Sequence, residues 1–229
     1  MSIHDGHRKR LRQRFLQEGL EHFTDVQVLE LVLFYAISRQ DTNPIAHALL
    51  DHFGSLSQVM DAPVEELCKV EGIGENTAAY LHLITQVGGC YLRDRAAKVN
   101  ILPTMESCAA YLHPYFYGRS IEMVYLLCLD AKCKLLTCRK IAEGNVTPTS
   151  LSIRKIVETA LLANASSVLL AHNHPGGMAI PSYEDIATTR NVVSALRAVE
   201  VRFVDHLIFC EDDYVSLVQS GYLAEESEE

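Results

Sequence analysis

Several features that would assign this chain of 229 residues to a common class are missing. No apolar run reaches the roughly 18–20 residues that a membrane-spanning helix needs. The segment 1–15 carries charges but lacks the apolar stretch of a secretory signal. Basic residues are also scarce, because 20 Lys and Arg stand against 29 Asp and Glu, a net charge of −9. These absences predict a cytoplasmic protein without a membrane segment, whose main task is not to coat nucleic acid.

Paired cysteines are a further absence. The chain has seven cysteines, an odd number, and no two of them form a C-x-x-C pair. Most lie in apolar segments, which predicts reduced, buried thiols of the kind found in cytosolic proteins. A zinc site held by cysteines is therefore excluded, and a metal must take other ligands.

The first half of the chain has the sequence pattern of a helical module. A basic segment with spaced apolar residues opens it, and Asn43-Pro44 is typical of a helix start. A turn at Gly72-Ile73-Gly74 precedes the last helix of this half. The expected helices cover residues 7–20, 25–36, 43–54, 55–60, 63–70 and 76–91.

The second half alternates strands and helices, which predicts an α/β sandwich around one sheet. We place the domain boundary near residue 98, giving a helical domain 1–98 and an α/β domain 99–229, so the fold class is α+β overall. Residues 145–150 are turn-rich, and the acidic tail follows residue 224. The expected strands cover residues 122–130, 135–142, 167–172, 201–209 and 214–217, with helices starting at 107 and covering 153–163 and 182–199.

The densest chemical signal is a spaced set of polar residues, H-x-H-x7-S-x2-D, formed by His172, His174, Ser182 and Asp185. Two histidines at i and i+2 of an extended segment point to the same side. Asp185 would lie in the first turn of the following helix, with its carboxylate towards the two imidazoles. Two His and one Asp form a three-ligand set that leaves a fourth position for water, as in catalytic zinc sites.

Each piece of this pattern also has a simpler interpretation. A pair of histidines at a strand end is usually polar surface, and Ser182-x-x-Asp185 fits a capping box. The combination after a buried strand favours the metal site, and Ser182 can serve as a cap at the same time. Asp205-His206 offers an extra metal or relay pair, but we favour a local hydrogen bond within a strand.

The segment 172–185, with this spacing, resembles the JAMM (MPN) metal motif. The chain as a whole resembles the bacterial RadC family over residues 6–223. The resemblance implies a three-layer domain with one mixed sheet, similar to cytidine deaminases, after a helical module. It also implies a Zn²⁺-dependent hydrolase, with a peptide or protein as substrate. The supporting stretches are GHRKRLRQRFLQEG, LFYAISRQDTNPIAHALL, VEGIGENTAAYL, AHNHPGG and VDHLIF.

The same resemblance implies roles for individual residues. His172, His174 and Asp185 would hold the zinc ion, and Ser182 would donate a hydrogen bond to the developing oxyanion. An upstream glutamate would act as general base. Glu122, at a strand start, is preferred, with Glu143 as the rival and an ordinary exposed glutamate as the simpler interpretation of Glu122.

The first half raises the question of DNA. Gly72 and Gly74 resemble the hairpin of a helix-hairpin-helix module, whose glycines let backbone N–H groups approach a phosphate. A turn that only needs tight packing is the alternative, and acidic residues surround it. The stronger electrostatic candidate is the basic helix with Arg8, Lys9, Arg10, Arg12 and Arg14.

Three functions are therefore open. The first is a zinc peptidase of the JAMM type that the helical module directs to its target. The second is a DNA-associated module whose metal domain is a non-catalytic scaffold. The third is a protein-interaction scaffold without metal.

Overall fold

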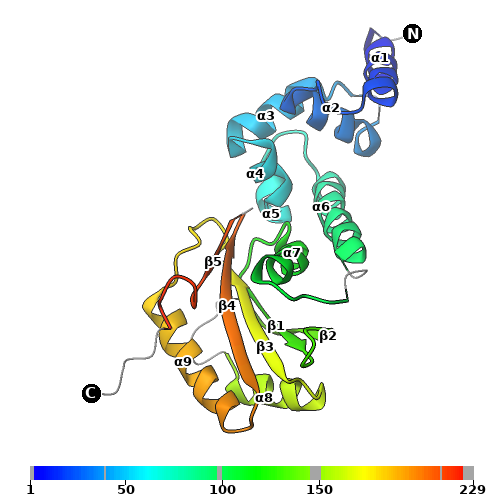
Figure 1. The fold of residues 1–229 in the computed structure, drawn as a ribbon. Coiled ribbons are helices and arrows are strands. Elements are labelled where there is room, and N and C mark those ends of the chain that lie inside the picture. Colours follow the sequence, from blue (N-terminus) through cyan, green and yellow to red (C-terminus); the bar gives the residue numbers. More distant parts are fainter. Residues whose placement is uncertain (1–2, 39, 97–99, 145–150, 212, 224–229) are drawn as a thin grey trace. The chain divides into compact units, whose positions relative to one another are not determined.

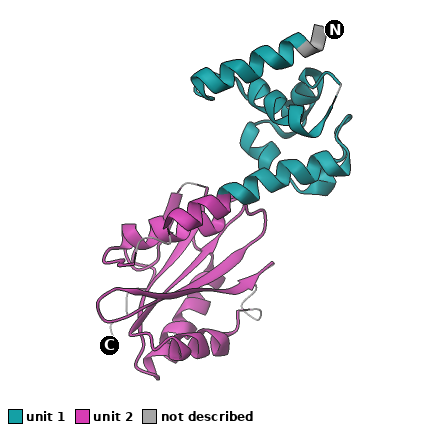
Figure 2. Cartoon of the chain, turned by 90° about the vertical axis from the view of Figure 1, so that its right-hand side faces the viewer, with its two compact units in different colours: residues 1–88 teal, residues 89–229 magenta. Residues whose placement is uncertain are grey.

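The computed structural model describes residues 3–38, 40–96, 100–144, 151–211 and 213–223. The chain forms two compact units, residues 1–88 and 89–229 (Figure 2). The division falls inside α6 (Glu75–Ala96), which contributes to both units. The domain limit expected at residue 98 lies among residues 97–99, outside the described residues, and stays a prediction.

Unit 1 is helical, as expected, and three of its helices begin at residues typical of a helix start. Thr24 forms a capping box with Gln27, Pro44 lies in the first turn of its helix, and Ser55 accepts a hydrogen bond from the Gln58 amide. The helices of this unit are α1 (Ile3–Glu18), α2 (Asp25–Ala36), α3 (Asn43–Phe53), α4 (Leu56–Asp61), α5 (Val64–Leu67) and the start of α6. Apolar side chains from α2 to α6 form one core.

Unit 2 is built on one mixed sheet of five strands, in the order β2-β1-β3-β4-β5 (Figure 1). β1 is antiparallel to both β2 and β3, β3 is parallel to β4, and β5 is antiparallel to β4. The parallel pair is joined through a helix, as a parallel connection requires. The strands are β1 (Met123–Leu129), β2 (Leu135–Glu143), β3 (Ser167–Asn173), β4 (Arg202–Cys210) and β5 (Asp213–Ser216).

Helices cover both faces of this sheet, giving three layers (Figure 1). α7 (Met105–Phe116) packs on one face, and α8 (Ile153–Leu162) and α9 (Tyr183–Arg197) pack on the other. β1 and β3 are buried along their whole length, so they read as continuous apolar runs. The expected α+β fold with one mixed sheet is confirmed. The turn-rich residues 145–150 lie outside the described residues.

The pairing of β3 with β4 contains one irregularity. Val168 pairs with Phe203, but the next residue, Leu169, pairs with Asp205, so Val204 is an extra residue in β4. Further along, Leu170 pairs with His206. A bulge of this kind changes which face the following side chains occupy. Separately, no described helix has the length and apolar character needed to cross a membrane.

Candidate metal centre

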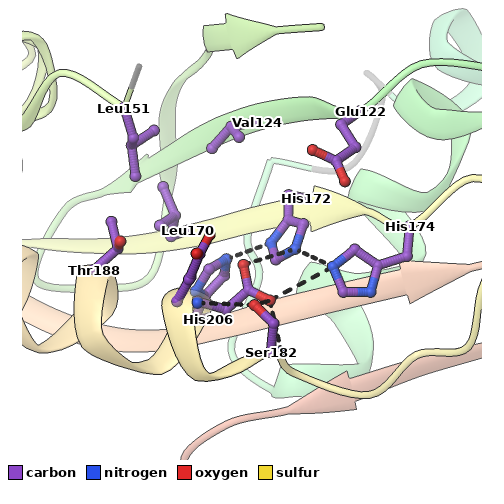
Figure 3. Close-up of a pocket in the computed structure, with 11 residues that line it drawn as sticks. Glu122, Val124, Leu151, Leu170, His172, His174, Ser182, Thr188 and His206 are labelled. Carbon is purple, nitrogen blue, oxygen red and sulfur yellow. Dashed lines mark hydrogen bonds and ion pairs between the residues drawn. The ribbon is translucent and has the colours of Figure 1, made fainter. Parts of the chain in front are cut away.

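The two motif histidines lie at the end of β3. His172 is 4% exposed, and the His174 amide donates to the Phe209 carbonyl of β4 at 2.8 Å. That bond keeps the chain extended beyond the last residue of β3. As expected for positions i and i+2, both imidazoles lie on the same side (Figure 3).

Asp185 reaches the histidines from the first turn of α9. Ser182 is the N-cap, and its Oγ accepts a hydrogen bond from the Asp185 amide at 3.1 Å. In return, Asp185 Oδ2 accepts from the Ser182 amide at 2.8 Å and from its hydroxyl at 2.6 Å. The capping box therefore fixes the carboxylate. Its Oδ1 lies 3.4 Å from His172 Nε2, and its Oδ2 lies 3.5 Å from His174 Nε2.

These three side chains have the geometry of a metal site. One ligand atom from each lies within 4.8 Å of the others, and no other such group occurs among the described residues. Tetrahedral ligand atoms about 2.0–2.2 Å from a metal lie about 3.3–3.6 Å apart. Each histidine lies within this range of one Asp185 oxygen, His172 of Oδ1 and His174 of Oδ2, whereas the two Nε2 atoms, at 2.8 Å, lie at hydrogen-bond distance. The donor set therefore fits a metal ion.

The electrostatics of the site keep two of the three candidate ligands, His172 and Asp185, in the forms that bind metal. Burial lowers the pKa of His172 to about 4, against the attraction of Asp185. The hydrogen bond to Asp185 raises the pKa of His174. Burial alone would raise the pKa of Asp185, but His174, His172 and Ser182 outweigh it and lower that pKa well below its ordinary value. The carboxylate is thus ionised, and His172 is neutral.

A cavity of about 180 Å³ opens over these residues, and Glu122 lies on its wall (Figure 3). Glu122 directly precedes β1, on the same face as Val124, which pairs with His172. The rival, Glu143, is not in the lining and forms an ion pair with Lys140. The lining consists of Glu122, Val124, Leu151, Leu170, His172, His174, Ser182, Glu184, Asp185, Thr188 and His206.

The residue between the two histidines holds the backbone of Glu122. The Asn173 side chain accepts a hydrogen bond from the Met123 amide at 2.8 Å and donates to the Ile121 carbonyl at 3.1 Å. The Glu122 carbonyl also accepts from the Gly144 amide at 2.9 Å. Sequence reasoning missed Asn173, since its partners lie about fifty positions away and only the β1–β3 pairing brings them together.

His206 is a second residue beside the site, for which the sequence favoured a local hydrogen bond over a relay. The expected local hydrogen bond is present, from the His206 amide to Asp205 Oδ1 at 2.7 Å. In addition, His206 Nε2 lies 2.8 Å from His172 Nδ1, and His206 Nδ1 lies 2.6 Å from the Thr189 hydroxyl. Burial holds the pKa of His206 well below its ordinary value.

The candidate DNA contacts of unit 1 are arranged differently. Arg8 donates to the carbonyls of Ile37 and Gln40 and stacks on Phe34 at 4.8 Å, while Lys9 and Arg10 are exposed. Arg12 donates to the Arg8 carbonyl at 3.4 Å, and Arg14 donates to the His22 carbonyl at 2.7 Å. Two of the five basic side chains therefore anchor α1 to its own unit.

The glycine turn also has a structural explanation at one of its two positions. Gly72 has φ +88°, and an added Cβ would lie 2.8 Å from Ile45 Cδ1. Only glycine suits that backbone and that close approach. Gly74 has neither constraint. Nearby Lys69 is paired with Glu66 at 2.6 Å.

Comparison with known proteins adds a family to this geometry. The profile of the RadC-like JAB domain matches residues 102–222, more than half of the chain. The chain belongs to the RadC-like JAB domain family. A second profile, the UPF0758 N-terminal domain, matches residues 6–79 of this RadC-like protein. The two matches cover the α/β unit and the helical unit.

Relatives of the RadC-like chain match it over nearly its full length. A UPF0758 protein of Ruegeria pomeroyi is 36% identical over 217 residues, covering 95% of this chain and 97% of the relative. One of Rhodobacter capsulatus is 35% identical over 213 residues, covering 93% and 100%. One of Fusobacterium nucleatum is 28% identical over 225 residues, covering 95% and 97%. The expected family is confirmed, and these relatives' names state no activity.

Proposed function

We propose that this RadC-like JAB protein is a zinc-dependent hydrolase that cleaves peptide or isopeptide bonds. The observation that carries the proposal is the convergence of His172, His174 and Asp185 in a cavity that also contains a glutamate. Imidazole nitrogen and carboxylate oxygen are zinc ligands, and three protein ligands are typical of catalytic zinc sites. A bound zinc ion supplies a Lewis acid and lowers the pKa of a coordinated water to about 7.

Glu122 is the proposed general base. Its carboxylate lies on the cavity wall, on the same sheet face as His172, so it can take a proton from an attacking water and deliver it to the leaving amine. Three hydrogen bonds hold the backbone around it, which limits its movement. Ser182 holds Asp185 through its hydroxyl, and it must turn that proton away to donate to a developing oxyanion.

The rest of the cavity favours a substrate with an apolar group beside the scissile bond. Val124, Leu151 and Leu170 line the wall beyond His172 (Figure 3). Such a surface binds a methylene chain or an aliphatic side chain by removing it from water.

The test combines metal content with hydrolysis. We expect one zinc ion per chain by elemental analysis, its loss in His172→Ala and Asp185→Ala, and cleavage of members of a quenched-fluorescence peptide and isopeptide library. Absence of zinc in the wild-type protein would overturn the proposal. Stoichiometric zinc without hydrolysis of any member would instead favour the non-catalytic scaffold.

A further inference from the structure

A buried series of hydrogen-bonded side chains runs from the candidate metal centre into the layer between the sheet and α9. It begins at His172, passes through His206 and ends at Thr189, which is fully buried. Neither His206 nor Thr189 belongs to the set of metal ligands. Their contacts are of interest because an imidazole has two nitrogens, and the partner of one determines what the other can do.

The direction of these hydrogen bonds follows from the contacts of Thr189, the last residue of the series. The Thr189 hydroxyl lies 2.6 Å from the backbone carbonyl of Asp185, which can only accept. The single hydroxyl proton therefore goes to that carbonyl. Since Thr189 Oγ1 also lies 2.6 Å from His206 Nδ1, that nitrogen must carry a proton and donate it.

The same reasoning continues to the ligand. A neutral His206 with its proton on Nδ1 has a lone pair on Nε2, which accepts a hydrogen bond across 2.8 Å from His172 Nδ1. The only proton of a neutral His172 then lies on Nδ1, and its Nε2 lone pair faces His174 and Asp185. The reverse argument agrees, because a metal at His172 Nε2 leaves an Nδ1–H that needs an acceptor.

We propose that Thr189 and His206 are positioning residues that hold His172 in the tautomer with a free Nε2, so that this nitrogen can bind the metal. The inference rests on the proposed zinc site. The series of hydrogen bonds ends at the Asp185 carbonyl, so it connects two of the three proposed ligand residues, His172 and Asp185, behind the metal centre. Hydrogen-bond partners of metal ligands commonly orient them in this way.

His174 is held in the same tautomer by one backbone carbonyl. Its Nδ1 lies 3.2 Å from the Met178 carbonyl, which can only accept, so the single proton of a neutral ring lies on Nδ1 and Nε2 keeps a lone pair. Two Nε2 lone pairs 2.8 Å apart repel each other unless a cation, either a proton or a metal ion, lies between or beside them. The difference between the histidines is that one uses a carbonyl directly and the other uses a two-residue relay.

Nitrogen NMR tests the proposal directly. Long-range proton–nitrogen spectra of the zinc-loaded protein, labelled with ¹⁵N-histidine, report which ring nitrogen carries the proton. We expect His206 as the Nδ1–H tautomer and His172 with its proton on Nδ1, assigned by loss of signals in His206→Gln and His172→Gln. An Nε2–H tautomer at His206 would overturn the proposal.

Zinc affinity of matched variants provides a second readout. Thr189→Val removes the hydroxyl at nearly constant volume, and Thr189→Ser retains it. We expect Thr189→Val and His206→Leu to weaken zinc binding by roughly 10–100-fold, and Thr189→Ser and His206→Gln to stay near the wild type. Ser216→Ala is the control, since it removes a buried hydrogen bond to Asp205 next to the relay but outside it.

The outcomes separate this inference from the proposed function. A wild-type protein that binds no zinc removes the proposed function. A wild-type protein that binds zinc, with equal affinities for Thr189→Val and Thr189→Ser, removes the relay alone. If His206→Leu fails to fold, the threonine pair and the NMR tautomer still decide.

Discussion

Two stretches of this chain concentrate polar side chains, and the fold uses them in opposite ways. In α1, Arg8 and Arg14 turn back onto carbonyl oxygens of their own unit. In unit 2, His172, His174 and Asp185 direct their polar atoms at one another beside a cavity. Clustering in sequence is alike in both cases. What distinguishes a candidate site is that side chains from separate elements converge on a shared space.

The largest expected effect tests the chemical side of this comparison. Glu122→Gln keeps the shape of the side chain but removes its basicity, so we expect hydrolysis to fall by about 10²–10⁴-fold. Zinc content should remain at the wild-type level, because the glutamate is not among the three proposed ligands. Activity assays on the cleaved peptide, together with elemental analysis, check both parts.

Glu143→Gln is the matched control for that variant. Glu143 is paired with Lys140 and lies outside the cavity lining, so its loss should leave hydrolysis unchanged. The opposite result, with Glu143→Gln inactive and Glu122→Gln active, would transfer the role of base to the rival residue.

The next effect tests whether the hydrogen bonds from Asn173 to the backbone around Glu122 matter to the site. Asn173→Ala leaves the buried Met123 amide without its acceptor, so we expect a loss of about 1–3 kcal/mol in the free energy of unfolding. Hydrolysis should also fall, since Glu122 loses its support. Urea denaturation measures the first quantity. Wild-type stability in this variant would show that the strand pairing alone suffices.

A smaller effect is expected from the anchoring arginine. Arg8→Ala removes hydrogen bonds to two carbonyls in the segment after α2, those of Ile37 and Gln40, and the stacking on Phe34, and the side chain is partly exposed. We expect unfolding free energy to fall by about 1–2 kcal/mol. Lys9→Ala, one residue away and exposed, serves as control. Equal stabilities would contradict the anchoring role.

The smallest effect concerns DNA. Lys9→Gln with Arg10→Gln removes two exposed charges, and we expect stability to change by less than about 0.5 kcal/mol. If α1 binds DNA, this variant should reduce the salt dependence of binding by about one unit of slope per residue. We expect the salt dependence to be the same in the variant and the wild type. Fluorescence anisotropy with duplex DNA at several salt concentrations measures it, and a smaller slope in the variant would contradict this expectation.

The sequence predicted most of the fold and part of the site, for physical reasons. The elements of unit 2 follow from local patterns, and the spacing of His172, His174, Ser182 and Asp185 is contained within fourteen consecutive residues. A strand end and a capped helix start bring such a segment together without long-range information.

Glu122, Asn173 and His206 depend on strand pairing instead. Glu122 had to be chosen between two glutamates by resemblance, and the antiparallel β1–β3 register is what places it beside the cavity. The contact of His206 with His172 depends on the β3–β4 register, which no local pattern encodes. The anchoring of Arg8 likewise depends on how α1 packs on α2.

The extra residue in β4 has a consequence for how this site could change. In an unbroken ladder continuing from Phe203, Asp205 would occupy the face of His172, and His206 would turn towards α7. A one-residue slip of β4 that removed this bulge would thus place a carboxylate, instead of a neutral ring, behind His172. The group that faces His172 from β4 therefore depends on the register of that strand as well as on the identity of the neighbouring side chain.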